Sequence, residues 1–229
     1  MFFCLIFESF TFQFDEGRNT HLSSIMNTYW VALMSVSNEM QKLTEQIIHC
    51  KRCELYKTRN NPVVGEGSDE ADLFFIGEAP GLNEDKQGRP FVGRAGKILD
   101  ELIESIGLNR SDIYIANILK CRPPNNRNPT KNEIETCSPY LKKQIDFINP
   151  SVILPMGSFA TEYVFDTFDL PFTKISKLHG KLFSKQTLYH QIRILPLYHP
   201  AVATYNPNRK TVLLEDIKQV KPFIISRTV

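Results

Sequence analysis

Residues 73–93 read LFFIGEAPGLNEDKQGRPFVG, and this stretch decides the expected fold. Its first four residues are a short apolar run that ends at a glycine, which is typical of a buried β-strand. The turn at 77–81 carries Glu78, so a carboxylate is expected at the end of the strand. A second turn, at 88–93, places Phe91 among glycines and a proline, in a loop that a plain core does not need. Taken alone, the stretch fits an ordinary strand-to-helix connection equally well.

Short apolar runs alternate with amphipathic segments along the rest of the chain. Further strands are predicted at 113–118, 152–154 and 192–195. Helices are predicted around 40–47, over 94–106, from the capping-box pattern at 130–133, over 158–165 and around 212–220. Pro139 either kinks the helix that starts at the capping box or begins a second segment. This alternation predicts βαβ units, and therefore an α/β fold with a parallel sheet and helices on both faces.

Three polar residues come at or just after predicted strand ends: Glu78, Asn117 and His199. Each has an ordinary explanation, as a helix cap, a turn former or a loop histidine. However, open parallel sheets bind their ligands at the carboxyl ends of the strands. We therefore expect these three side chains to converge on one site.

The composition limits the number of domains and the class of protein. The chain has 229 residues, 42% hydrophobic and 23% charged, which suits one substantial domain over 39–229. Residues 1–38 lack its periodicity and are expected to be a disordered extension, or the product of a start codon upstream of the true one. No membrane span or signal peptide is recognisable, so a cytoplasmic protein is expected. It is also expected to be a monomer. The net charge of +2 means that contact with nucleic acid needs a local basic surface.

The five cysteines are Cys4, Cys50, Cys53, Cys121 and Cys137. A CxxC pair that closes a helix favours metal binding over a redox dithiol, because thioredoxin-like pairs follow a strand and open a helix. Four thiolates suit either tetrahedral zinc or an iron–sulfur cluster, and the wide spacing favours the larger group. Cys4 is left over.

Together these motifs resemble the family 4, iron–sulfur uracil-DNA glycosylases. The resemblance spans roughly 40–220 and rests on GEAPG at 77–81, GRPFVG at 88–93, NILKCRPP at 117–124, HPA at 199–201 and the order of four cysteines. It implies a three-layer α/β/α sandwich with a mainly parallel, four-stranded central sheet. It also implies a [4Fe-4S] cluster on Cys50, Cys53, Cys121 and Cys137. The implied reaction is hydrolysis of the N-glycosidic bond of deoxyuridine in single- or double-stranded DNA, a step of base excision repair.

Such an enzyme must take the base out of the helical stack and hold it in a pocket. Phe91 is the expected stacking platform, and Gly77 and Ala79 are expected to border the base. The carboxamide of Asn117 offers one donor and one acceptor, which match O4 and N3–H of uracil but not the reversed pattern of cytosine. In the best-known uracil-DNA glycosylases, an acid and an aromatic ring that excludes the thymine methyl group occupy the positions of Ala79 and Gly81. The side chains of Ala79 and Gly81 cannot replace either group.

Breaking the bond builds negative charge on the uracil ring. His199, as a neutral imidazole, is the expected donor to O2, where it stabilises that charge. Glu78 and Glu84 are competing candidates to activate the water.

Cations that flank the motifs are expected to contact phosphates. The candidates are Arg122, Arg127, Arg209 and Lys210, together with Lys51, Arg52 and Lys120. Two other functions stay open: a zinc or iron–sulfur nucleic-acid-binding module without catalysis, and a related glycosylase with a broader base preference.

Overall fold

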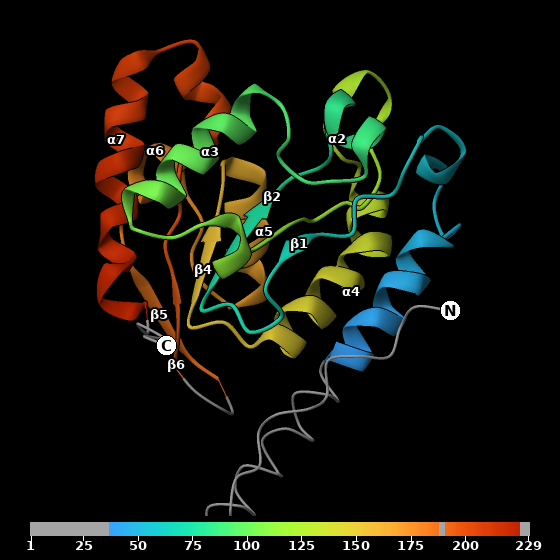
Figure 1. Cartoon of the computed structure of the whole chain (residues 1–229), viewed down its shortest axis with the longest axis horizontal. Coiled ribbons are helices and arrows are strands. Elements are labelled where there is room, and N and C mark those ends of the chain that lie inside the picture. The colour runs from blue at the N-terminus through green and yellow to red at the C-terminus, as the bar shows by residue number, and fades with distance from the viewer. Residues whose placement is uncertain (1–36, 188–190, 225–229) are drawn as a thin grey trace, which may run out of the picture. The chain divides into compact units, whose positions relative to one another are not determined.

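The computed structural model describes residues 37–187 and 191–224 (Figure 1). The strands are β1 (Glu66–Gly67), β2 (Leu73–Gly77), β3 (Tyr114–Asn117), β4 (Val152–Pro155), β5 (Phe183–Gln186) and β6 (Gln191–Ile194). The helices are a first helix over 37–48, α2 (Leu82–Gln87), α3 (Arg94–Ser105), α4 (Lys131–Ile148), α5 (Ser158–Thr167), α6 (Ile175–Leu178) and α7 (Pro207–Ile217). Short 3-10 turns include η1 (Glu54–Lys57), η2 (Arg110–Asp112), η3 (Pro124–Asn126), η4 (Pro200–Thr204) and η5 (Lys218–Phe223).

The strands form one sheet in the order β1-β3-β2-β4-β6-β5. The four strands predicted from the sequence are its centre, and β3, β2, β4 and β6 run parallel to one another. This confirms the α/β class and the parallel core. Because the chain passes from β2 to β3 on one side and later to β4 on the other, the strand order reverses at β2. Ligand sites of open α/β sheets lie at such a point.

The predicted number of four strands is wrong, because the described residues form a sheet of six. The additional strands, β1 and β5, are antiparallel edge strands. β1 is only two residues long and contains a glycine, and β5 has the sequence FSKQ with alternating half-buried and exposed residues. Neither contains the apolar run by which a buried strand is recognised in a sequence, since an edge strand does not need one.

β2 is buried on both sides, which explains its unbroken apolar sequence. Leu73 and Phe75 pack into a cluster with residues of α3 and α7, whereas Phe74 and Ile76 pack into the cluster on the opposite face with residues of α4, α5 and the first helix. Figure 1 shows these helices on the two sides of the sheet. The arrangement is the predicted three-layer α/β/α sandwich.

The start of α4 confirms the capping-box prediction. Thr130 Oγ1 accepts from the Glu133 N–H at 3.3 Å, and the Glu133 carboxylate accepts from the Thr130 N–H at 2.8 Å. Pro139 lies inside this one helix, so it does not start a second segment. α4 carries Cys137 across from the loop that follows β3.

Candidate active site

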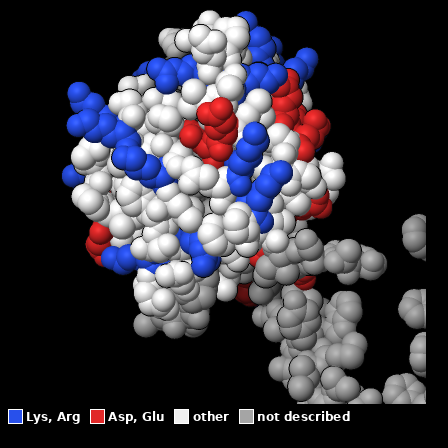
Figure 2. Space-filling view, turned by 90° about the vertical axis from the view of Figure 1, so that its left-hand side faces the viewer, with Lys and Arg blue, Asp and Glu red and all other residues white. Residues whose placement is uncertain are grey.

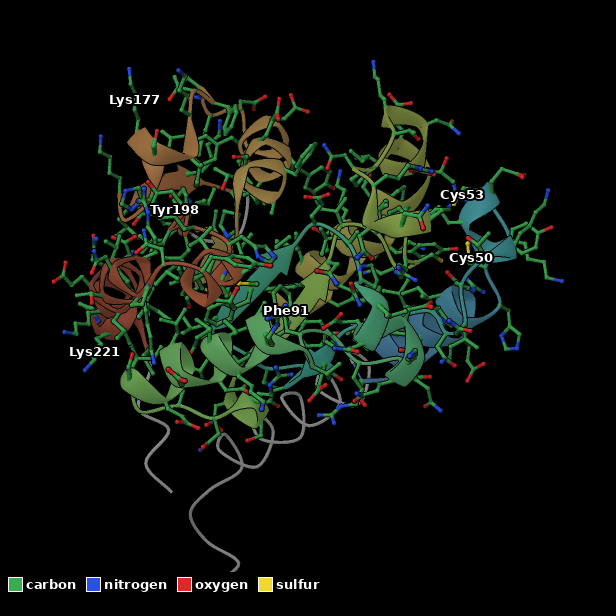
Figure 3. All side chains as sticks on the ribbon, turned by 90° about the horizontal axis from the view of Figure 1, so that it is seen from above. Cys50, Cys53, Phe91, Lys177, Tyr198 and Lys221 are labelled. Carbon is green, nitrogen blue, oxygen red and sulfur yellow. The ribbon has the colours of Figure 1, made fainter. Side chains whose placement is uncertain are left out.

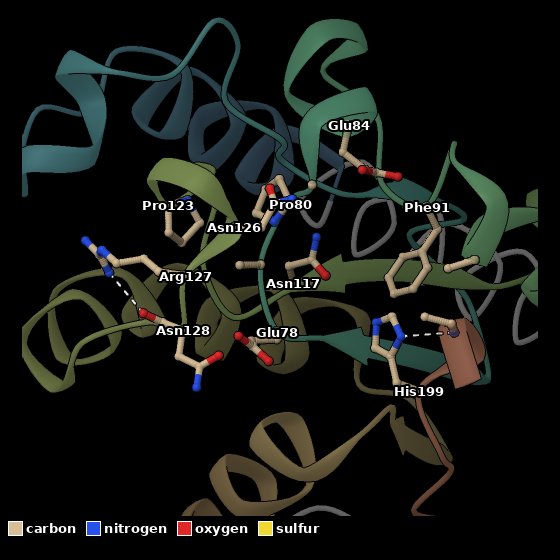
Figure 4. A pocket seen from close by; sticks show the side chains of 14 residues that line it. Glu78, Pro80, Glu84, Phe91, Asn117, Pro123, Asn126, Arg127, Asn128 and His199 are labelled. Carbon is tan, nitrogen blue, oxygen red and sulfur yellow. Dashed lines mark hydrogen bonds between the residues drawn. The ribbon is translucent and has the colours of Figure 1, made fainter. Parts of the chain in front are cut away.

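A cavity of about 460 Å³ opens at the carboxyl ends of the parallel strands (Figure 4). In this view Phe91 and His199 lie on one side, Pro123 and Arg127 on the other, and Asn117 between them. The lining residues are Glu78, Ala79, Pro80, Gly81, Glu84, Phe91, Ala95, Asn117, Pro123, Asn126, Arg127, Asn128, His199 and Ala201. The sheet edge thus brings Glu78, Asn117 and His199 together, as predicted.

The loop that carries Phe91 is held in an unusual conformation. Phe91 has φ +52°, a left-handed value that few residues with a side chain adopt. The next two backbone N–H groups donate to Oε1 of Glu84, at 3.0 and 3.1 Å. On the other side, the guanidinium of Arg110 donates to the carbonyl oxygens of Pro90 and Phe91. The surrounding structure therefore fixes the ring at the wall of the cavity.

Gly96 lets this loop lie against the first turn of α3. A Cβ at Gly96 would lie 1.8 Å from the carbonyl oxygen of Phe91, so no other residue fits without moving the loop. The glycine is therefore required by the position of the Phe91 backbone.

Asn117 lies at the bottom of the cavity, with only 2% of its surface exposed. Its Oδ1 is buried and has no hydrogen-bond partner among the described residues. A buried polar atom without a partner costs roughly 1–3 kcal/mol, so such atoms are rare in folded proteins and each needs an explanation, a catalytic role among them. Gly77 makes room for this side chain, since a Cβ there would lie 2.2 Å from Oδ1.

The imidazole of His199 has a defined tautomer. Its Nδ1 accepts from the backbone N–H of Ala201 at 3.2 Å, so Nδ1 carries no proton. Burial also lowers the pKa of His199, although the nearby carboxylate of Glu84 opposes that effect. The ring is therefore neutral at pH 7, with its proton on Nε2. It stacks on Phe91 with the ring centres 5.8 Å apart.

The two carboxylates at the cavity differ in their surroundings. Glu84 is engaged with the backbone of the Phe91 loop. Glu78 is half-buried, and desolvation raises the pKa of its carboxyl group, with no opposing hydrogen bond from the described residues. A carboxylate that is unpaired, partly desolvated and exposed to a cavity is suited to accept a proton.

The four predicted cysteine ligands line a second, narrow cavity next to the first helix, η1 and α4. Burial raises the pKa of the Cys53 and Cys121 thiols, and raises that of Cys137 to about 11. Hydrogen-bond donors approach the sulfur atoms, among them Arg59 Nη1, 3.1 Å from Cys121 Sγ, and the Lys120 N–H, 3.3 Å from Cys137 Sγ. Across residues 37–187 and 191–224, no three Cys, His, Asp or Glu side chains converge on the position of a single ion. Cys4 lies outside the described residues.

The chain matches known proteins over most of its length. A family model described as the uracil DNA glycosylase superfamily matches residues 64–220. A type-4 uracil-DNA glycosylase of Sulfurisphaera tokodaii is 46% identical over 190 residues, which are 82% of this chain and 86% of the relative. A second, of Archaeoglobus fulgidus, is 44% identical over 181 residues, covering 79% of this chain and 91% of the relative. The chain belongs to the type-4 uracil-DNA glycosylases.

A type-5 uracil-DNA glycosylase of Pyrobaculum aerophilum is more distant from this type-4 chain, at 28% identity over 177 residues, covering 71% of this chain and 75% of the relative. The type-4 assignment agrees with the family resemblance of the sequence motifs.

The predicted phosphate contacts of this type-4 chain are spread over several surfaces. Arg127 lines the cavity but also forms two hydrogen bonds to Glu133, at 2.9 and 2.6 Å. Arg122 binds the side chain of Asn126 at 2.7 Å. Arg209 is exposed and stacks its guanidinium 4.6 Å from the ring centre of Tyr198, and Lys210 pairs with Glu101. Figure 2 shows Lys and Arg side chains spread over the α6 and α7 face, with acidic side chains between them.

One of the cations expected to contact phosphate is misassigned. Lys120 is only 1% exposed, so its ammonium group cannot reach DNA. The end of the strand turns it into the protein, towards Gln144 on α4. The basic appearance of the sequence around Cys121 therefore overstates the basic surface there.

Residues that shape the site were also missed in the sequence. Arg110 holds the Phe91 loop from 19 residues away, and Asn126 and Asn128 line the cavity from the loop before α4. Nothing local in the sequence marks Arg110 as a holder of this loop, because its partners there are the backbone oxygens of Pro90 and Phe91, and its side chain also pairs with Asp100. The glycine requirement at Gly96 likewise becomes visible only with the loop in place.

Proposed function

We propose that this type-4 chain hydrolyses the N-glycosidic bond of deoxyuridine in DNA, releasing uracil and leaving an abasic site. The observation that carries the proposal is the buried carboxamide oxygen of Asn117, which has no hydrogen-bond partner among the described residues, in a side chain that lines a cavity bordered by Phe91 and His199. The N3–H of a uracil ring turned out of the DNA stack supplies the donor that this oxygen lacks. No helix within the described residues has the length and apolar character needed to cross a membrane.

Uracil recognition follows from the chemistry of the carboxamide. Oδ1 of Asn117 accepts from N3–H of uracil and Nδ2 donates to O4, whereas cytosine offers an acceptor and a donor in the reverse order. Phe91 provides an apolar ring face for the base, and Gly77 and Ala79 leave the space that the base occupies. A cytosine in this position leaves buried groups unpaired, at a cost of about 1–3 kcal/mol for each.

Cleavage is assisted by His199. When the bond between C1′ and N1 breaks, its electron pair passes to the uracil ring and negative charge develops at O2. The Nε2–H of the neutral imidazole donates to O2, and that hydrogen bond strengthens as the charge develops. Water adds to C1′ and its proton passes to a carboxylate. Glu78 is the proposed acceptor, because its carboxylate is unpaired at the cavity.

Glu84, the competing candidate for the water, is proposed to position Phe91 instead. Replacing Glu78 by Gln is expected to lower the single-turnover excision rate by about 100-fold, a usual contribution of a general base. Glu84→Gln is expected to cost less than about tenfold, since the amide oxygen still accepts from the two backbone N–H groups. Melting curves of both variants serve as folding controls. A larger loss in Glu84→Gln than in Glu78→Gln would reverse the two roles.

We also propose that Cys50, Cys53, Cys121 and Cys137 hold a [4Fe-4S] cluster. The residues fit this group in donor type and number, since four thiols from three segments line one cavity. When bound, the cluster ties the first helix, the loop after β3 and α4 together, and it supplies a one-electron redox centre. In Figure 3, Cys50 and Cys53 lie towards one end of the molecule and Phe91 lies nearer its middle. The proposed base pocket and the cysteine site are therefore separate, and bond cleavage is proposed to proceed without contact with the cluster.

Arg122, Arg127, Arg209 and Lys210 are proposed to contact the DNA phosphates. Arg209 is the strongest candidate, because it is exposed and follows the His199 loop. Lys210 and Arg127 would first have to leave, or share, their carboxylate partners Glu101 and Glu133. The monomeric state and the cytoplasmic location remain predictions from the sequence.

The predicted extension lies outside the described residues, apart from its last two. Deleting Met1–Ser37 is expected to leave the melting temperature and the excision rate unchanged, because Met40, Leu43 and Ile47 supply the core contacts of the first helix. A truncated protein that is insoluble or inactive would show that residues 1–37 belong to the domain.

The function is tested with purified protein and oligonucleotides that contain uracil, a thymine mismatch or hypoxanthine. Release of uracil alone, from single- or double-stranded substrates, is the expected result. Release of several bases would favour the related glycosylase with a broader base preference. Binding of DNA without release of any base would instead favour the non-catalytic nucleic-acid-binding module.

A further inference from the structure

Lys120 lies between the cysteine site and the base pocket. The residue is 1% exposed, three residues after Asn117 and directly before Cys121. Taking an ammonium group out of water is strongly unfavourable unless acceptors and a countercharge surround it. The contacts of Lys120 therefore show what the surrounding structure uses this cation for.

On one side, Lys120 holds the backbone of the residue proposed to read the base. Its Nζ donates to the carbonyl oxygen of Asn117 at 3.0 Å and to Oε1 of Gln144 at 2.6 Å. The amide nitrogen of Gln144 donates to Val64 O at 3.0 Å and to the hydroxyl oxygen of Tyr114 at 3.1 Å. The side-chain oxygen of Gln144 is therefore fixed towards Lys120. This network leaves the Asn117 backbone little freedom to move.

On the other side, Lys120 faces the thiols. Its backbone N–H donates to Cys137 Sγ at 3.3 Å, and its side chain lines the same cavity as the four cysteines. Within the described residues no carboxylate forms an ion pair with Lys120, and Cys137 and Cys121 lie close enough to interact with its charge when they are ionised. If the four cysteines hold a metal, their thiolates would therefore lie close to a buried cation for which the described residues provide no carboxylate partner.

We propose that Lys120 is a positioning residue that couples the cysteine site to base recognition. Its ammonium group offsets the negative charge of the four thiolates and, in the same position, fixes the Asn117 carbonyl. The inference rests on the cluster and the reading role of Asn117 proposed above. It predicts that removing this one charge weakens both the retention of iron and the chemical step, although Lys120 touches neither the DNA nor the reacting bond.

The test is Lys120→Met, which keeps the length of the side chain and removes its charge. We expect iron release to a chelator to be accelerated about tenfold and the single-turnover excision rate to fall about tenfold, as for loss of a buried hydrogen bond to a charged donor. The KM for DNA should stay within about twofold, since no surface contact changes. Lys142→Met, an exposed lysine on α4, is the matched control and should change none of these quantities.

A purely structural role would lower the melting temperature while leaving iron release or the excision rate at the wild-type value. Either quantity unchanged in a folded Lys120→Met protein overturns the proposal. If that variant does not fold, Lys120→Gln, which removes the charge but keeps an amide donor in the side chain, takes its place, and the same two outcomes decide the proposal. A wild-type protein that contains no iron, or excises no uracil, would instead contradict the proposed cluster or function.

Discussion

Asn117→Asp is expected to lower the rate of uracil excision by about 100-fold while the protein stays folded. A carboxylate accepts from N3–H of uracil as the carboxamide does, but it has no hydrogen to donate to O4. It places two oxygen atoms against each other in a buried pocket, and the lost donor and the repulsion each cost about 1–3 kcal/mol. Single-turnover kinetics on a uracil oligonucleotide measure the effect.

The same variant should gain weak activity on cytosine at low pH. A protonated aspartic acid donates to N3 of cytosine and accepts from its N4 amino group, so the pattern of the pocket is reversed. Excision of cytosine should therefore increase as the pH falls, because only the protonated form has the donor.

The competing explanation is that Asn117 only completes the end of β3. In that case Asn117→Asp would lower the free energy of unfolding by about 1 kcal/mol and leave the base preference unchanged. A melting curve beside the kinetics separates the two explanations. A normal uracil rate in the folded variant would remove Asn117 from the site.

The centre of the fold could be predicted from the sequence because its strands are buried on both faces. Such strands must be apolar throughout, as in LFFI at 73–76, and this run is visible without any tertiary information. The edge strands β1 and β5 were not predicted, because a strand at the edge of a sheet does not need an apolar run. β1 consists of Glu66 and Gly67, and its register opposite Tyr114 and Ile115 arises only when the sheet assembles.

The candidate site was predictable where its residues follow the strands directly. Asn117 ends β3 and Glu78 follows β2, so their convergence is a consequence of sheet topology. The different surroundings of Glu78 and Glu84 were not predictable, because the partners of Glu84 are backbone N–H groups of a loop with a left-handed residue. Neither the sequence spacing nor the residue types encode that geometry.

Lys120 shows the opposite error, in which neighbouring charges in the sequence suggest a common surface. Lys120 and Arg122 are two residues apart, yet Lys120 points into the protein and only Arg122 keeps solvent contact. Close to a buried strand end, a cation is as readily a counterion of the interior as a contact for phosphate. The burial of each side chain decides between these roles, and burial follows from packing against α4.

The largest effect on composition and stability is expected from loss of a cysteine ligand. The purified protein should be brown, with broad visible absorption and bound iron, and Cys121→Ser should lose nearly all of both. Serine keeps a hydrogen-bond acceptor for Arg59 but is a poor ligand for iron, so the change tests metal binding more than packing. Because metal binding contributes to folding free energy, the melting temperature should fall as well.

Cys4→Ser is the matched control, since it removes a thiol that lies outside the proposed set. It should leave the iron content, the colour and the melting temperature at their wild-type values. Iron and visible absorption are measured on protein purified without oxygen. A colourless wild-type protein with stoichiometric zinc would contradict the cluster while leaving the glycosylase reaction intact, because Asn117, His199 and Glu78 act without contact to the thiols. Loss of iron in Cys4→Ser, with iron retained in Cys121→Ser, would show instead that the four ligands have been wrongly assigned.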